Sequence, residues 1–183
     1  MTSPFPTASF LDKKNKSGTD GLHLNRMLDA APGNPGIDAR WTSSAKNGIG
    51  TALSRHSRVW FTLSHGVLNE IYYPRVDSAC TRDFGFVVTG KDGYFSEEKR
   101  DCDTKTETVA PGIPAFSITN TARDGLYRIE KHIVTDPARA CVLQRISFTA
   151  FKGDVTDYRV TALLAPHLVN AGQLNSAWIG EFE

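Results

Sequence analysis

The chain has 183 residues, of which 40% are hydrophobic and 22% are charged, and its formal net charge is +1. This composition is typical of a globular domain and differs from that of disordered or fibrous sequences. Lysine and arginine are scattered among nearly as many acids, without the basic face of a nucleic-acid-binding protein, so we expect no nucleic-acid partner. No apolar stretch is long enough for a transmembrane helix, so we expect no membrane partner.

The first thirty residues are polar and lack a sustained hydrophobic period. We interpret residues 1–30 as a disordered or weakly structured tail, and the Pro- and Gly-rich run at 31–36 as the entry into a domain over residues 31–183. The start, Met1 to Leu11, contains two prolines and lacks the apolar run of a secretory signal. The chain as given is therefore expected to be cytoplasmic, and periplasmic or secreted if its true N-terminus is missing.

From residue 59 onward the hydrophobic pattern repeats every two residues, which predicts β-strands. Val59–Leu63 is the first predicted strand, and residues 59–77 are predicted to form a buried hairpin. The glycine-rich segment before it, including Gly48 and Gly50, is interpreted as a flexible loop, because it lacks the further residues of a phosphate-binding loop. The polar run Thr104–Val109 predicts a strand at an edge or a solvent face.

Alternation is cleanest at residues 127–133, where one set of side chains is predicted to face the core and the other the solvent. The first set is Tyr127, Ile129, Lys131 and Ile133, and the second is Arg128, Glu130 and His132. About eight to ten short strands separated by turns predict an all-β fold, an antiparallel β-sandwich, with an open barrel as the main alternative. The final residues Trp178–Phe182 are strand-like, so either they form an edge strand or the sandwich is incomplete at its C-terminus, which we favour.

Catalytic chemistry is not predicted from the residues themselves. Glycoside hydrolysis needs two suitably placed carboxyl groups, and no pair of acids near the aromatic segments has a spacing that this chemistry demands. These acids are Glu70, Asp77, Asp83, Glu97, Glu98, Asp101 and Asp103. The five histidines lack the spacing of a zinc site, a GxSxG motif is absent, and the three cysteines are interpreted as reduced thiols. We therefore predict no catalytic residue, metal site or cofactor.

Aromatic residues are the remaining lead, because sugars present apolar C–H faces that stack on rings. In a strand, however, adjacent side chains point to opposite faces, so one of Trp60 and Phe61, and one of Tyr72 and Tyr73, should be buried. We favour core packing over sugar contact for most of these rings.

Several segments together resemble one family. The strongest are Ser57–Leu63 (SRVWFTL) and Glu70–Asp77 (EIYYPRVD), preceded by residues 31–36 (APGNPG) and followed by residues 134–137 (VTDP). In order and spacing they resemble the N-terminal β-domain of bacterial glucoamylases and glucodextranases, glycoside hydrolase family 15. The resemblance covers residues 31–183.

The resemblance implies the first part of a large β-sandwich, similar to galactose-mutarotase-like domains, which packs against a downstream (α/α)6 barrel. That barrel carries both catalytic glutamates, and the family removes terminal α-linked glucose from α-glucans with inversion. Neither glutamate maps onto this sequence, so the chain alone is expected to be inactive. Tyr73, Arg75 and Asp77 are the residues expected to contact substrate or barrel, and the resemblance admits an α-glucan as ligand. The alternative is a stand-alone carbohydrate-binding β-sandwich.

Overall fold

The computed structural model describes residues 46–168 and residue 175, all within one compact unit. The expected tail at 1–30 and the strand-like run Trp178–Phe182 therefore lie outside the described residues. The described strands are β1 (Gly48–Thr51), β2 (Trp60–Ser64), β3 (Val67–Tyr72), β4 (Ala79–Gly90), β5 (Phe95–Glu97), β6 (Cys102–Thr108), β7 (Phe116–Ala122), β8 (Tyr127–Thr135), β9 (Val142–Ala150) and β10 (Tyr158–Pro166). The helical turns are η2 (Lys91–Gly93), α2 (Glu98–Asp101) and η3 (Val155–Asp157).

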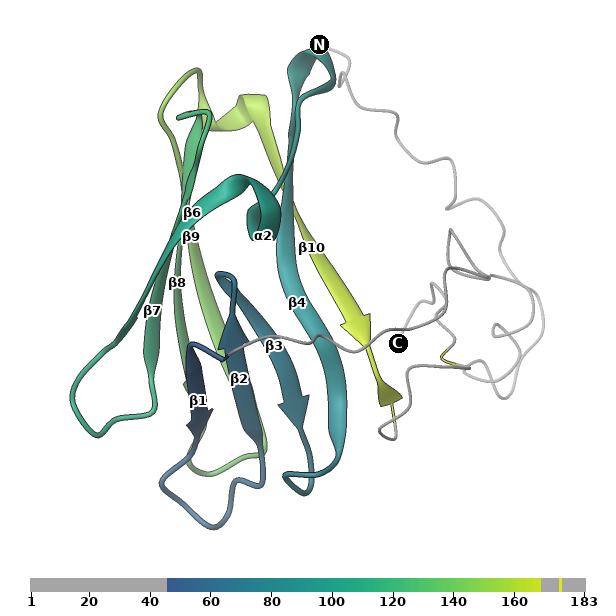
Figure 1. Cartoon of the computed structure of the whole chain (residues 1–183), viewed down its shortest axis with the longest axis vertical. Coiled ribbons are helices and arrows are strands. Elements are labelled where there is room, and N and C mark those ends of the chain that lie inside the picture. Colours follow the sequence, from purple (N-terminus) through teal and green to yellow (C-terminus); the bar gives the residue numbers. More distant parts are fainter. Residues whose placement is uncertain (1–45, 169–174, 176–183) are drawn as a thin grey trace, which may run out of the picture. The chain divides into compact units, whose positions relative to one another are not determined.

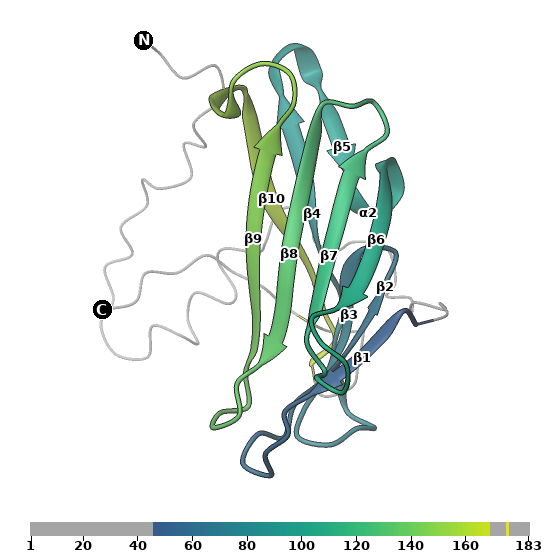
Figure 2. The same ribbon diagram turned by 90° about the vertical axis from the view of Figure 1, so that its left-hand side faces the viewer.

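The strands form two antiparallel sheets that face each other across the core (Figure 1, Figure 2). One sheet has the order β1-β2-β3-β4-β10, with β5 also paired to β4, and the other has the order β6-β7-β8-β9. The predicted antiparallel sandwich is therefore confirmed, and in the described part of the chain no strand pairing closes the sheets into a barrel.

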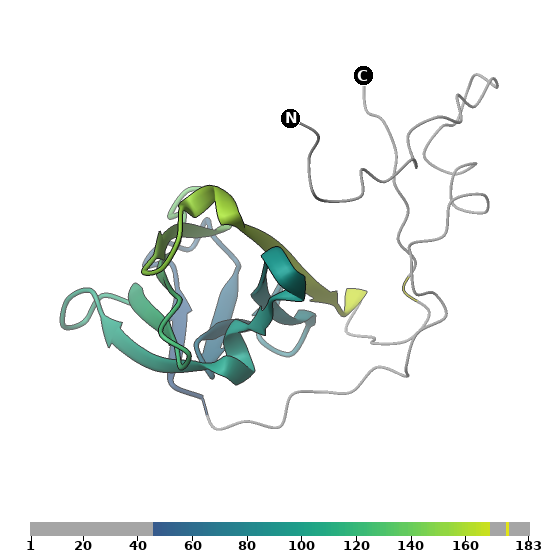
Figure 3. The ribbon, with the colours of Figure 1, turned by 90° about the horizontal axis from the view of Figure 1, so that it is seen from above.

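Strand β4 is the central strand of the first sheet, and it is long enough to pair with three other strands. Its first half pairs with β3, its second half pairs with β5, and β10 runs along its other side. The chain crosses between the sheets twice, through α2 after β5 and through η3 after β9. Figure 3 looks down on the end of the sandwich where η2 and η3 lie.

The core consists of two apolar clusters with a polar layer between them. The first cluster contains Phe61, Leu63, Leu68, Phe116, Ile118 and Ile133, and the second contains Phe86, Val88, Cys102, Ala122, Tyr127 and Ile129. Between them, Asn120 of β7 and Lys131 of β8 point inward and are fully buried. The predicted alternation along residues 127–133 is confirmed, including the inward direction of Lys131.

The predicted hairpin is confirmed and supplies part of this polar layer. Strands β2 and β3 are joined at His65 and Gly66, whose φ angles of 50° and 73° suit a tight hairpin turn. A Cβ at Gly66 would lie 2.3 Å from the Asn120 side-chain oxygen, so the turn approaches β7 too closely for any other residue. The Gly66 carbonyl accepts hydrogen bonds from Asn120 and Lys131. The hairpin tip is thereby tied to the opposite sheet.

The interpretation of Gly48–Gly50 as a flexible loop is wrong, because these residues belong to strand β1, which pairs with β2. A Cβ at Gly50 would lie 2.2 Å from the ring of Phe61, and one at Gly48 would lie 2.7 Å from the ring of Phe116. The glycines therefore allow two buried rings to pack directly against the β1 backbone. The glycine-rich composition suggested a flexible segment, whereas in the fold these glycines allow side chains to pack closely against the β1 backbone.

Candidate functional site

The three residues expected to contact substrate or barrel lie in one exposed loop between β3 and β4, residues 73–78, which we call the Tyr73 loop. The guanidinium Nε of Arg75 donates to Asp77 Oδ1 at 2.9 Å, and Nη2 donates to the other carboxylate oxygen. Mainly through this hydrogen bonding, the pKa of Arg75 is raised and the pKa of Asp77 is lowered. The structure thus brings Arg75 and Asp77 together as a surface ion pair.

The Tyr73 ring faces the neighbouring β1–β2 loop. It is 41% exposed, and the Arg58 guanidinium carbon lies 5.7 Å from its centroid. Arg58 also helps to line a shallow hollow of about 350 Å3 formed mainly by residues 51–60. Of the two adjacent aromatic pairs, the first follows the prediction, because Phe61 is fully buried and Trp60 is half-buried. The prediction is wrong for the second pair, in which Tyr72 is half-buried and Tyr73 is exposed, because β3 ends at Tyr72 and alternation does not continue into the loop. This end of the sandwich therefore presents an aromatic ring together with arginines.

The more buried carboxylates are held by cations or by hydrogen-bond donors. Glu70 accepts from Lys46 and from the Thr62 hydroxyl, both at 2.5 Å. Asp83 accepts from the Asn69 amide at 2.8 Å and lies 3.3 Å from the Lys99 ammonium. These contacts tie β2, β3 and β4 together. They indicate structural roles for these acids.

The described residues contain no group of three or more His, Cys, Asp or Glu side chains that could hold a metal ion. The three cysteines are free thiols; Cys102 is buried and the other two are half-buried. Nor do the described residues include a helix with the length and hydrophobicity that a membrane span requires.

A second surface, which the sequence pattern did not single out, lies where β9 and β10 form the edges of the two sheets. Register places Ile146 of β9 opposite the buried Lys131, and Leu164 of β10 opposite Phe84, which packs against both core clusters. Both side chains therefore point toward the interior of the sandwich. They are nevertheless 38% and 55% exposed.

The exposure of these interior positions arises because β10 diverges from β9. Next to η3 the two strands are close, and the Phe148 and Tyr158 ring centroids lie 5.6 Å apart. Farther from η3 the strands separate, as Figure 1 shows. The interior is consequently uncovered at this side of the described sandwich. We define the open edge as Leu143, Gln144, Ile146, Ala162, Leu163 and Leu164.

Gln144 adds a polar feature to the open edge. Register pairs it with the buried core residue Ile133, so its side chain also faces inward. Both its amide oxygen and its amide nitrogen are buried, yet neither has a hydrogen-bond partner in the part of the chain that the structure describes. A buried amide usually has at least one partner. The sequence could not reveal this surface, because an uncovered strand and a covered strand have the same alternation.

Comparison with known proteins gives a consistent result. The family model described as "Glucodextranase, domain N" matches residues 31–183. A glucoamylase from Clostridium sp. (strain G0005) is 35% identical over 150 residues, which cover 82% of this chain and 21% of that protein. The crystal structure of a bacterial glucoamylase complexed with acarbose is similar with a TM-score of 0.75 and 34% identity, over 78% of this chain and 21% of that one.

The chain thus spans about a fifth of the length of these two relatives. The match of the family model to residues 31–183, together with the identity and the shared fold, is sufficient to assign the family. The chain belongs to the glucodextranase domain N family.

Proposed function

We propose that this chain is the non-catalytic N-terminal domain of a glucoamylase-like enzyme, which hydrolyses terminal α-linked glucose from α-glucans with catalytic residues outside these 183 residues. Two observations support this proposal. Both relatives are glucoamylases of which the matched region is only 21%. The carboxylates that are most deeply buried in the described sandwich, Glu98 and Glu70, are bound to lysines rather than facing a pocket.

The open edge is the structural observation on which the proposal chiefly rests. Unpaired strand edges with exposed apolar side chains are aggregation-prone unless something covers them. Among the described residues, both edges lie on the same side of the sandwich and the interior between them is accessible. A surface of this kind suits a domain that packs on more polypeptide of the same parent enzyme, including its catalytic region.

The Tyr73 loop is proposed as the place where this domain contacts the catalytic barrel or the substrate. Its Tyr73 ring and its Arg75–Asp77 ion pair are exposed, and they offer both stacking and hydrogen-bonding groups. In the parent enzyme, Tyr73→Ala and Arg75→Ala should raise KM or weaken the attachment of the domain. Val109→Ala, at a 56% exposed position just after β6, on the opposite edge of the second sheet from β9, is the control and should change neither.

Hydrolysis is the direct test of the proposed function. The gene is cloned with its downstream sequence, and glucose release from maltooligosaccharides is measured for the full product and for the 183-residue chain. The full product should release glucose as the β-anomer, as expected for inversion, and the short chain should release none. Glucose release by the short chain, or a full product that lacks further coding sequence for a catalytic region, would contradict the proposal.

A further inference from the structure

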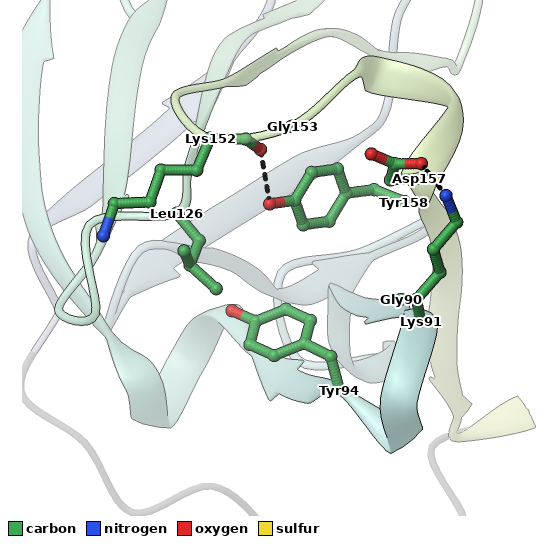
Figure 4. A pocket seen from close by; sticks show the side chains of 8 residues that line it. All are labelled: Gly90, Lys91, Tyr94, Leu126, Lys152, Gly153, Asp157 and Tyr158. Carbon is green, nitrogen blue, oxygen red and sulfur yellow. Dashed lines mark hydrogen bonds and ion pairs between the residues drawn. The ribbon is translucent and has the colours of Figure 1, made fainter.

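A hollow of about 240 Å3 lies at the end of the sandwich farthest from the Tyr73 loop, and we call it the tyrosine hollow (Figure 4). Three connections meet there: the β4–β5 turn, the β7–β8 turn and the segment between β9 and β10. The hollow is lined by Gly90, Lys91, Tyr94, Leu126, Lys152, Gly153, Asp157 and Tyr158.

The two tyrosine rings in the hollow are held in place before any ligand arrives. Tyr94 and Tyr158 pack edge to face, with centroids 6.1 Å apart and an interplanar angle of 84°. The Tyr94 hydroxyl donates to a carboxylate oxygen of Asp124, and the Tyr158 hydroxyl donates to the Lys152 carbonyl, both at 2.7 Å. Phe148 supports Tyr158 from behind. Rings fixed in this way lose little conformational entropy when they bind a ligand.

Tyr94 and Tyr158 are only half-buried, so part of each side chain remains accessible to a ligand. Each hydroxyl already has a partner, so what the rings can offer a ligand is mainly their apolar surface. Leu126 extends this surface from the β7–β8 turn. The floor of the hollow is therefore apolar and largely aromatic.

The rim of the hollow is polar and balanced in charge. The Lys91 ammonium lies 2.5 Å from Asp157 Oδ1 on one side of the tyrosines, and Lys152 lies on the other side (Figure 4). Asp124, which accepts from the Tyr94 hydroxyl, adds a second carboxylate near the hollow, so two lysines and two carboxylates lie in or beside its lining. This balance favours a neutral ligand over an anion. The Lys91–Asp157 pair supplies both a donor and an acceptor at one edge, which suits adjacent hydroxyl groups.

We propose that the tyrosine hollow is a carbohydrate subsite that binds one hexose unit of a glucan, with a sugar C–H face on the tyrosines and hydroxyls on Lys91 and Asp157. The volume is below the roughly 300–1,000 Å3 of drug-sized pockets, so one ring is the appropriate size and a Kd on the order of 1 mM is expected. The choice of glucose rests on the proposed function, whereas binding of a hexose does not.

The test is a titration of the isotopically labelled 183-residue chain with maltotriose, followed by the backbone amide signals in NMR. We expect the largest chemical-shift changes at Lys91, Gly153 and Tyr158. Sorbitol, a polyol that lacks the pyranose ring, is the control ligand and should cause smaller changes. Tyr94→Ala should weaken binding at least tenfold. Ile113→Ala, which removes an exposed apolar side chain from the loop between β6 and β7, should leave it unchanged.

A second variant protects the test against a folding defect. Lys91 is exposed, so Lys91→Met removes the donor without disturbing the core, and it should weaken binding several-fold while the other amide signals stay in place. Three outcomes would overturn the proposal: no shifts at 20-fold the expected Kd of about 1 mM, shifts centred on the Tyr73 loop, or equal shifts with sorbitol. None of them would affect the proposed function, which depends on hydrolysis by the full product.

Discussion

The Lys131 ammonium lies 2.9 Å from each carboxylate oxygen of Glu98, and this fully buried pair joins the two sheets across the core. Lys131 comes from β8 in one sheet, and Glu98 comes from α2 beside the other. Glu98 also accepts from the Phe86 backbone N–H and from the Asn120 amide. Burial raises the pKa of Glu98 and lowers the pKa of Lys131, while their mutual attraction opposes both shifts.

Removal of one member of this pair should strongly destabilise the fold. Lys131→Met leaves the Glu98 carboxylate buried without its cation, which should lower the free energy of unfolding by about 3–5 kcal/mol. Urea unfolding followed by tryptophan fluorescence measures the change. Lys105→Met, in the exposed Lys105–Glu107 pair, is the control and should leave the midpoint nearly unchanged.

The double variant Lys131→Met, Glu98→Met distinguishes the cost of leaving one buried charge unpaired from the contribution that the two side chains make by packing. Buried ion pairs can often be replaced by apolar residues of similar volume with little loss. We therefore expect the double variant to be more stable than Lys131→Met alone. Equal stability of Lys131→Met and Lys105→Met would show that Lys131 is not an essential cation of the core.

Gly50 should not tolerate a side chain, because a Cβ would lie 2.2 Å from the buried Phe61 ring. Gly50→Ala should lower the free energy of unfolding by about 1–3 kcal/mol, the usual effect of overpacking. Ile49→Ala, at a 66% exposed position of the same strand, should change it by less than about 0.5 kcal/mol. The same unfolding assay compares them. If Gly50→Ala is as stable as Ile49→Ala, the glycine is not required for packing.

The open edge should make the isolated chain self-associate at high concentration. Leu164→Lys places a charge among its apolar side chains and should shift sedimentation velocity profiles toward monomer. Leu164 is 55% exposed, so thermal stability should change little. Leu53→Lys, at an 84% exposed position elsewhere, is the matched control and should leave association unchanged. A wild-type chain that stays monomeric at every concentration would contradict the prediction that the open edge causes self-association.

His167 should make stability fall as the medium becomes mildly acidic. Burial, and secondarily the nearby Arg82, lowers the pKa of His167. The unfolded chain therefore binds a proton more readily, so stability is fully present above about pH 6.5 and is lost as pH falls from there toward the lowered pKa. Unfolding free energies between pH 7.5 and pH 5 measure this loss.

The variant His167→Gln should reduce the slope of stability against pH in this window, whatever its own stability. His132→Gln replaces an exposed histidine of β8 and is the control. It should retain the wild-type slope. An unchanged slope in His167→Gln would assign the pH dependence to other groups.

Local pattern predicted most of the sandwich. Alternation from Tyr127 to Ile133 correctly predicted which side chains face the core, because strand geometry sends neighbouring side chains to opposite faces. The turn at Lys91–Gly93 likewise follows from local chemistry, because Asp92 and Gly93 adopt φ angles of 55° and 76°, which suit these residue types in a tight turn. By contrast, the strand Gly48–Thr51 was not predicted, because glycine is rare in strands. The glycines are needed here because the rings of Phe61 and Phe116 pack directly against the backbone of this strand, which the local sequence does not reveal.

The sequence was enough to predict the fold class and the family, and the closeness of Arg75 and Asp77 follows from their positions in one short loop. Which surfaces are available depends on the tertiary structure. It joined Glu98 to Lys131 across 33 residues, brought Tyr94 beside Tyr158, and left Ile146 and Leu164 uncovered although they face inward. Alternation specifies the face of a sheet, but whether that face is covered depends on the other sheet and on how far their edges diverge.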